Sequence, residues 1–186
     1  LPHMSSEFSE PGYEVRAFKT ELARCGRLAR QWGHRLTMHP GQYVQLGSPR
    51  SEVVAASVDE LRVGAEIMHA LGCKPPTSCL VIHLGGHFND RAGAMARWRA
   101  VFEALPNSIA EYIAIENDEL WSLAECLELW HTISGPIKPP IVVDFFHDTL
   151  NPTPELAMLL PVVAETWTVR GGRPKCHVSE QKVDTV

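Results

Sequence analysis

The chain has 186 residues, which is the length of one ordinary domain. Its composition is 45% hydrophobic and 21% charged, which excludes a disordered chain. Seventeen Lys and Arg against 22 Asp and Glu give a net charge of −5. That balance argues against a general basic surface for nucleic acid, although it is compatible with a local basic patch. We therefore expect a single globular domain over residues 1–186.

The cysteines and the length of the apolar runs indicate the cellular compartment in which the protein is expected. The five cysteines form no Cys-x-x-Cys pair, and two of them lie inside apolar runs, which predicts buried thiols rather than a disulfide framework. No apolar stretch approaches the roughly 18 residues that a membrane span needs. No basic segment followed by an apolar one opens the chain, so no signal peptide is expected. We expect an intracellular protein without membrane association.

In chain order, segments of helical periodicity alternate with short β-rich runs. An amphipathic helix is expected over 18–32, followed by a strand over 35–39. A Ser-Pro pair predicts the N-cap of a second helix at Ser48, and a glycine predicts its end at Gly72. The next strand is expected over 79–83.

The later part of the chain repeats this pattern. A third helix is expected after Asp90, and a capping-box sequence at Ser122 predicts the start of a fourth. A fifth is expected to begin at Thr153 and to break near Pro161. Strands are expected at 112–116, 141–144 and 175–178. Strands separated by helices predict βα units with a parallel sheet, as in a TIM (β/α) barrel.

Each predicted strand ends on a residue that can bind a metal or move a proton. In order these residues are His39, His83, Glu116, Asp144 and His177. The carboxyl ends of parallel strands meet on one face, where βα barrels build their active sites. Three imidazoles and two carboxylates on that face predict a site for Zn²⁺ or Mn²⁺. His147, three residues after Asp144, is a candidate ligand or supporting partner.

The alternative is that these residues have structural roles. A single histidine at a strand end is more often a surface or core residue, and an acidic residue there is often a helix N-cap. Five such residues at five successive strand ends are difficult to attribute to chance. The remaining histidines of the central chain lie in predicted helices or loops, and we expect them to be solvated: His34, His69, His87 and His131.

Two loops are candidates for contact with nucleic acid. Gln42 and Tyr43 follow the first predicted strand, where an amide can bind a base edge and a ring can stack on a base. The alternative for Tyr43 is a core aromatic that closes the turn. Segment 170–175 is the densest basic cluster; it could contact phosphates or be a solvated loop.

Several motifs occur in the order and spacing of the UV-damage endonuclease family, which the chain resembles over nearly its whole length. They lie at residues 35–43, 48–50, 82–86, 116–118, 144–147, 166–167 and 175–179. The resemblance implies a TIM-barrel fold related to endonuclease IV. It also implies an enzyme that nicks UV-damaged double-stranded DNA immediately 5′ to cyclobutane dimers and 6-4 photoproducts, with Mn²⁺ as the usual cofactor.

The resemblance also implies metal ligands. His39, His83 and Glu116 resemble one metal site. Glu116, Asp144 and His177 resemble most of a second site, so that Glu116 bridges two ions and is a catalytic residue. Up to three divalent ions are implied, with Zn²⁺ or Mg²⁺ as alternatives to Mn²⁺. Such ions lower the pKa of bound water and offset the charge of a phosphate under in-line attack.

Four further residues match family positions. His147 resembles a ligand of a third metal, and Lys175 matches a catalytic lysine that the family carboxylates near that metal. Gln42 and Tyr43 match the pair that wedges into the duplex and senses the lesion. Wedging costs less at a lesion, where stacking is already weakened.

About five βα units are expected here, whereas typical barrels have about 250 residues, so we expect an incomplete barrel that lacks N- and C-terminal strands. A fragment, a truncated product or a barrel closed by an associated chain would each explain this. An abasic-site endonuclease, a sugar isomerase and a non-catalytic metal- or DNA-binding remnant stay open as alternative functions. We expect a cytoplasmic protein from a bacterial source, or a nuclear or mitochondrial one from a fungal source.

Overall fold

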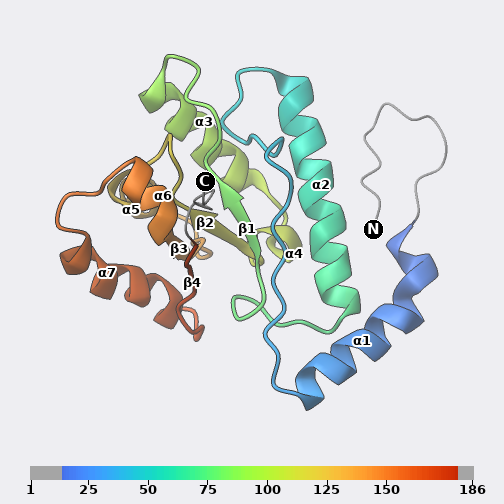
Figure 1. The fold of residues 1–186 in the computed structure, drawn as a ribbon. Helices are drawn as coiled ribbons and strands as arrows, with labels where there is room; N and C mark the ends of the chain where they lie inside the picture. The colour runs from blue at the N-terminus through green and yellow to red at the C-terminus, as the bar shows by residue number, and fades with distance from the viewer. Residues whose placement is uncertain (1–13, 180–186) are drawn as a thin grey trace, which may run out of the picture.

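The computed structural model describes residues 14–179, in which short parallel strands alternate with helices (Figure 1). The helices are η1 (Val15–Phe18), α1 (Lys19–Gln31), α2 (Ser51–Ala70), α3 (Arg91–Ala104), α4 (Asn107–Ala110), α5 (Leu123–Thr132), α6 (Phe145–Leu150) and α7 (Leu156–Thr168). The strands are β1 (Leu80–His83), β2 (Ile113–Glu116), β3 (Ile141–Asp144) and β4 (Cys176–His177). No helix in this part of the chain is both long and apolar enough to span a bilayer.

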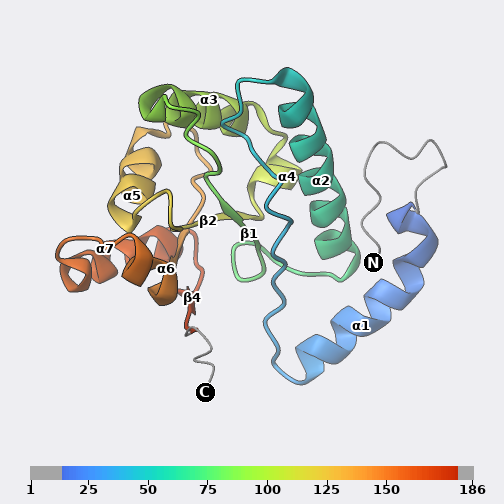
Figure 2. The same cartoon turned by 45° about the horizontal axis from the view of Figure 1, so that its top comes forward.

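The four strands form one parallel sheet in the order β1-β2-β3-β4. The register places His83 opposite Glu116, and Asp144 opposite His177. Helices α2, α3, α5 and α7 form an arc around the strands (Figure 2). An α/β architecture of consecutive parallel βα units is confirmed, and it corresponds to part of a TIM barrel.

The expected strand over 35–39 is wrong as a strand. The segment contributes an isolated parallel bridge between Met38 and Leu80, with backbone hydrogen bonds from Met38 to Cys79 and from Val81 to Met38. Its first residue, Arg35, instead uses its guanidinium to bind the carbonyl groups of Thr77 and Pro174. The segment nevertheless lies beside β1, which brings its last residue to the same end of the sheet.

Two expected helix limits are also wrong. Ser48 does not cap α2: its hydroxyl accepts a hydrogen bond from the Arg50 backbone at 3.2 Å, within a turn that precedes the helix. Helix α7 continues through Pro161 to Thr168. Its residues Leu159, Leu160 and neighbouring valines pack on the core, and this burial offsets the hydrogen bond that proline cannot donate.

Other local expectations are confirmed. The Asp90 side chain caps α3 by accepting a hydrogen bond from the Gly93 backbone at 2.9 Å. The Ser122–Glu125 capping box is formed at the start of α5. All five cysteines are free, and Cys79 and Cys126 are buried as expected from their apolar surroundings.

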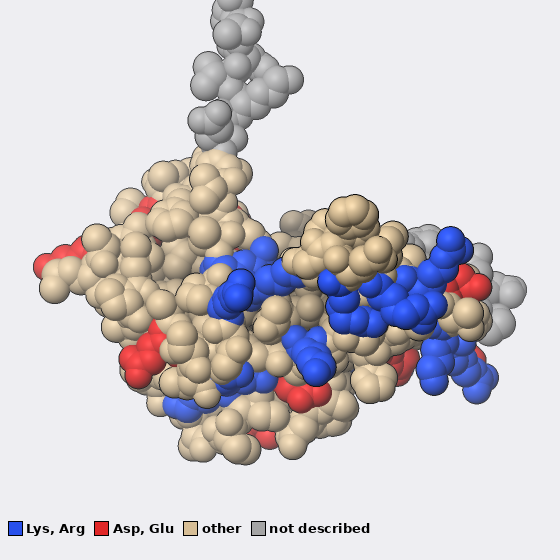
Figure 3. Space-filling model, turned by 90° about the horizontal axis from the view of Figure 1, so that it is seen from below, with Lys and Arg blue, Asp and Glu red and all other residues tan. Residues whose placement is uncertain are grey.

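Lysine and arginine side chains gather on the lower face of the molecule (Figure 3). The arrow of β1 points away from that face in Figure 1, so the face lies at the amino ends of the strands. Arg170, from the basic segment 170–175, has a structural role. Its guanidinium donates hydrogen bonds to the backbone carbonyls of Lys138 and Glu111 at 3.2 and 2.9 Å. Burial lowers its pKa.

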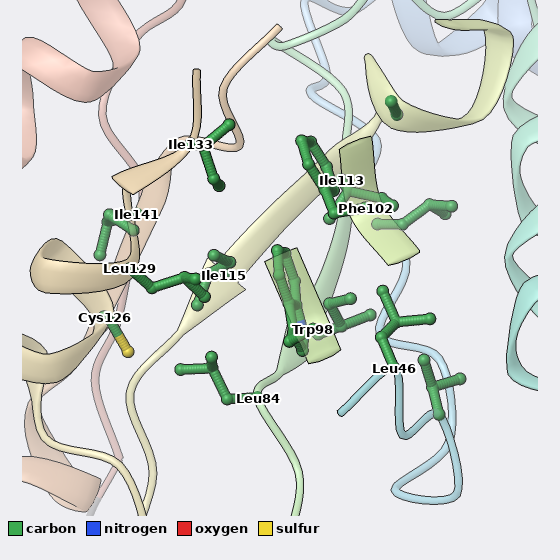
Figure 4. Packing of buried hydrophobic residues seen from close by; sticks show 14 of the residues in the cluster. Leu46, Leu84, Trp98, Phe102, Ile113, Ile115, Cys126, Leu129, Ile133 and Ile141 are labelled. Carbon is green, nitrogen blue, oxygen red and sulfur yellow. The ribbon is translucent and has the colours of Figure 1, made fainter. Parts of the chain in front are cut away.

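Successive side chains of each strand point to opposite faces of the sheet. Those on one face point toward the helices and join the large core, which includes Trp98, Phe102, Ile113 and Ile115 (Figure 4). Those on the other face belong to a smaller cluster of buried residues: Cys79, Val81, Ala114, Val142 and Trp167. Because side chains alternate with a period of two, the terminal His83, Glu116 and Asp144 share the face of this smaller cluster. The strand sequences therefore place the candidate ligands inside the arc.

Candidate metal centre

Glu116, the last residue of β2, lies at the centre of the candidate site and is 1% exposed. Its Oε2 atom lies 2.8 Å from His39 Nε2 and 3.7 Å from His83 Nε2. Its Oε1 atom accepts a hydrogen bond from His177 Nδ1. One carboxylate thus gathers three histidines that the sequence places at three different strand ends.

A second group of potential ligands surrounds the same carboxylate. Glu116, Asp144 and His147 each offer a ligand atom, and these atoms lie within 4.8 Å of one another. Asp144 Oδ2 is 3.8 Å from His147 Nδ1 and 3.9 Å from His177 Nδ1. His147 therefore belongs geometrically with Glu116 and Asp144, whereas the family resemblance alone had implied a separate third site for it.

Backbone carbonyl groups orient three of the histidines. The Nδ1 atoms of His39, His83 and His147 face the carbonyl oxygens of Pro40, Glu116 and Asn117 at 3.2, 3.4 and 3.0 Å. A proton on each Nδ1 would make Nε2 the ligand atom once a cation takes the place of the proton that His39 Nε2 donates to Glu116, and this is the usual arrangement of metal-binding histidines. The ring centroids of His39 and His83 are 5.1 Å apart, and those of His83 and His147 are 5.4 Å apart.

Two buried residues of the site were not identified from the sequence. The Asn117 side chain accepts a hydrogen bond from the Asp144 backbone N–H at 2.8 Å and donates one to the Asp144 backbone carbonyl at 3.0 Å. Asp118 accepts backbone hydrogen bonds from Leu120 and Trp121, and its Oδ2 atom lies 3.6 Å from His83 Nδ1. Their position directly after a strand-end carboxylate was the available signal.

The electrostatics of the site favour an ionised Glu116. Burial raises the pKa of this carboxyl, but hydrogen bonds from His39 and His177 outweigh burial and hold the pKa below its usual value. The hydrogen bond to Glu116 raises the pKa of His39, against the opposing effect of burial. For Asp118, burial raises the pKa and outweighs the opposing hydrogen bond from the Trp121 backbone.

The donor set fits divalent metal ions. His39, His83 and Glu116 form one group of potential ligands, and Glu116, Asp144 and His147 form another that shares the same carboxylate. Mixed imidazole and carboxylate ligands suit Zn²⁺ or Mn²⁺. A buried carboxylate shared by two groups is the feature expected where two ions act on one phosphate.

The loop after His39 presents the two residues expected to contact DNA. Tyr43 is 75% exposed, so the alternative of a core aromatic is wrong. Gln42 is also exposed, and its carbonyl accepts a hydrogen bond from Gln45 Nε2 at 3.3 Å. Lys175 lies close enough to lower the pKa of His39 electrostatically. The exposure of Gln42 and Tyr43 is compatible with contact to DNA, and Lys175 is close to the candidate metal ligands. The roles of these three residues stay predictions.

The chain is similar in sequence and in structure to UV-damage endonucleases. A family model described as UV-endonuclease UvdE matches residues 2–185. The UV-damage endonuclease of Schizosaccharomyces pombe is 34% identical over 179 residues, which cover 91% of this chain and 29% of that protein. A crystal structure described as SacUVDE is 30% identical, with a TM-score of 0.82, over 96% of this chain and 60% of that one.

A solved D-psicose 3-epimerase has a TM-score of 0.65 at 16% identity, over 87% of this chain, which is a likeness of fold alone. The chain spans less than two thirds of the length of the three proteins compared.

Proposed function

This chain belongs to the UV-endonuclease UvdE family, and from that membership we propose that it carries the catalytic centre of a metal-dependent DNA repair endonuclease. Its substrate would be duplex DNA with UV photoproducts, cut immediately 5′ to the lesion. The observation that carries the proposal is the buried Glu116 carboxylate, which lies close to His39 after the isolated bridge at Met38, to His83 at the end of β1 and to His177 at the end of β4. The exposed Gln42 and Tyr43 in the loop that follows His39 favour a DNA substrate over a sugar.

The proposed cofactor is Mn²⁺, with up to three ions. When bound, the ions supply Lewis-acid activation and offset the charge of the scissile phosphate. His39, His83 and Glu116 would hold one ion, and Glu116, Asp144 and His177 most of a second. His147 lies next to the second group and would complete it or hold a third ion together with Lys175 in its carboxylated form.

The protein's own residues set the geometry of the site. Glu116 is kept ionised by hydrogen bonds from His39 and His177, so it offers both oxygens to the site. Asn117 joins the ends of β2 and β3 through two hydrogen bonds to Asp144. This connection fixes the separation of the two carboxylates, and such fixed geometry is the protein's main contribution to in-line phosphate chemistry.

Gln42 and Tyr43 would select the lesion. We infer that they enter the base stack, where an intrusion costs less at a photoproduct because stacking is already disturbed. Their loop is braced by Gln45, whose amide connects it to the Gly86 backbone of the next strand-end loop at 3.0 Å. A braced loop can hold an exposed ring in place during such an intrusion.

Incision of an oligonucleotide duplex with one cyclobutane dimer tests the proposal. We expect a Mn²⁺-dependent nick 5′ to the dimer that EDTA abolishes, and a loss of about 100-fold or more in His39→Ala. His69→Ala, which removes an exposed histidine of α2, is the matched control and should retain full activity. A folded chain that binds Mn²⁺ but does not nick the dimer would overturn the proposal. Faster cutting at an abasic site would favour the abasic-site alternative.

A further inference from the structure

Two polar side chains of α2 contact the loop that follows His39 and belong to neither group of candidate metal ligands. Ser57 and Glu60 are three residues apart in this helix, so they share one of its faces. Ser57 is 2% exposed, and Glu60 is half-buried. The segment that joins α1 to α2 runs alongside α2 (Figures 1 and 2). The helix therefore offers two polar groups to the backbone of this loop.

Gln42 and Tyr43 occupy the tip of a tight turn in the loop. The Val44 N–H donates a hydrogen bond to the Gly41 carbonyl at 3.1 Å. This bond makes Gln42 and Tyr43 the two central residues of a β-turn. Tyr43 is 75% exposed, whereas Val44 is 4% exposed. The turn is thus packed at its base and projects its tip into solvent.

Each of the two α2 side chains holds one end of this turn. Glu60 Oε1 accepts a hydrogen bond from the Gly41 N–H at 3.0 Å. Ser57 Oγ accepts a hydrogen bond from the Gln45 N–H at 2.8 Å. The Ser57 hydroxyl donates its own proton to the Val53 carbonyl at 2.7 Å, which leaves a lone pair for Gln45. The two bonds enclose the tip from both sides.

These bonds are important because the tip itself is exposed. Exposed loops are among the most mobile parts of a protein unless their backbone is held. A loose turn has to be ordered each time its ring enters a base stack, and this ordering lowers the affinity. Because the stack opens more easily at a lesion than in intact duplex, the loss should fall on binding of damaged DNA.

We propose that Ser57 and Glu60 are positioning residues, which hold the turn of residues 41–44 against α2 and thereby set the preference for damaged over undamaged duplex. The inference rests on the proposed function, because it requires Gln42 and Tyr43 to enter the DNA. Each of the two residues acts through one backbone N–H of the loop rather than through DNA or a metal ion.

Steady-state kinetics on the dimer duplex test the proposal, with the same duplex lacking the dimer as a competitive inhibitor. Ser57→Ala and Glu60→Ala should each raise KM about tenfold, the scale of one hydrogen bond whose donor is left without a partner. The Ki of the undamaged duplex should stay within about twofold. A variant that is only less stable would lose kcat with its folded fraction and keep the KM of the wild type.

Two further variants separate the hydrogen bond from the charge of Glu60. Glu60→Gln removes the charge, as Glu60→Ala does, but it keeps an oxygen that can accept the Gly41 N–H. It should therefore restore KM to within about twofold of the wild type. Glu66→Ala is the matched control, because it removes another α2 carboxylate, which accepts a hydrogen bond from Arg62 at 2.7 Å. Its KM should equal that of the wild type.

Two outcomes would overturn the proposal while the wild type cuts the dimer: an unchanged KM in both alanine variants, or equal rises in KM and Ki. If the wild type cuts no duplex, the proposed function fails and the positioning role is judged by binding. Fluorescence anisotropy then measures the ratio of the affinities for the dimer duplex and the undamaged duplex. A lower ratio in Ser57→Ala than in Glu66→Ala would support the positioning role, and equal ratios would exclude it.

Discussion

At the scale of single residues, the candidate metal centre depends on side chains that orient other side chains. Asp118 is the most informative of these, because it is buried and its carboxylate faces the Nδ1 atom of His83 rather than Glu116. A carboxylate behind a metal-binding imidazole fixes the ring and increases its basicity. We therefore expect Asp118 to act on the site through His83.

Replacement of Asp118 by asparagine should weaken Mn²⁺ binding about 10- to 100-fold. The amide oxygen of asparagine still accepts the backbone hydrogen bonds of Leu120 and Trp121, so the turn is retained. Isothermal titration with Mn²⁺ measures the change. Asp90→Asn is the matched control, since Asp90 also accepts a backbone hydrogen bond but lies at the start of α3. Equal losses in both variants would contradict a role through His83.

The cysteines differ in reactivity because they differ in burial. Burial raises the pKa of the Cys79 thiol to about 11 and also raises that of Cys126 well above its usual value, whereas Cys25 and Cys176 are exposed. Only the thiolate reacts, so a thiol reagent at pH 8 should label Cys25 and Cys176 rapidly and leave Cys79 and Cys126 unreacted until the protein unfolds. Mass spectrometry of the labelled peptides checks this. Rapid labelling of Cys79 in the folded protein would contradict its burial.

At the scale of elements, the sequence was most informative where a local rule determines the structure. The β2 and β3 strands are predicted nearly to the residue, because short apolar runs bounded by helices have few alternatives. The start of α2 was missed because of a local turn, and the continuation of α7 through Pro161 was missed because it depends on tertiary contacts. A turn at Ser48 replaces the expected cap, and burial of the α7 leucines overrides the proline.

The candidate site could be predicted as a set of strand ends but not as a set of contacts. The four histidines His39, His83, His147 and His177 gather around the carboxylates of Glu116 and Asp144. Their pairing depends on the register between strands and on the turn after β2. Asn117 and Asp118 directly follow a strand-end carboxylate in the sequence, but their contacts with Asp144 and His83 arise only once the strands are paired.

The capping box of α5 offers a test at this scale. Ser122→Ala removes the hydroxyl that receives the Glu125 backbone hydrogen bond, and we expect a loss of about 1 kcal/mol in the free energy of unfolding. Chemical denaturation with urea measures it. Ser134→Ala serves as the control, because that hydroxyl bonds an exposed Glu103 side chain and should contribute only a few tenths of a kcal/mol. A smaller loss at Ser122 than at Ser134 would contradict the cap.

At the scale of the whole molecule, we expect metal binding and folding to be coupled, because the candidate ligands come from segments spread over most of the described chain. An ion that binds only the folded state stabilises it by about 2.7 kcal/mol at 100 times its Kd. Mn²⁺ should therefore raise the Tm of the wild type. Glu116→Gln, which removes the shared charge at the centre, should lose most of this increase. An equal rise in both would place the bound metal elsewhere.

The register of the sheet has a consequence for how this protein tolerates insertions and deletions. His83 and Glu116 are opposite one another, as are Asp144 and His177, so the backbone ladder aligns the ligands. A single residue inserted within β2 would turn Glu116 to the helix side and leave the histidines without their common partner. Additions to the connections on the opposite face, such as the turn at Gly171, shift no ligand. Length variation in this protein should therefore be confined to one end of its strands.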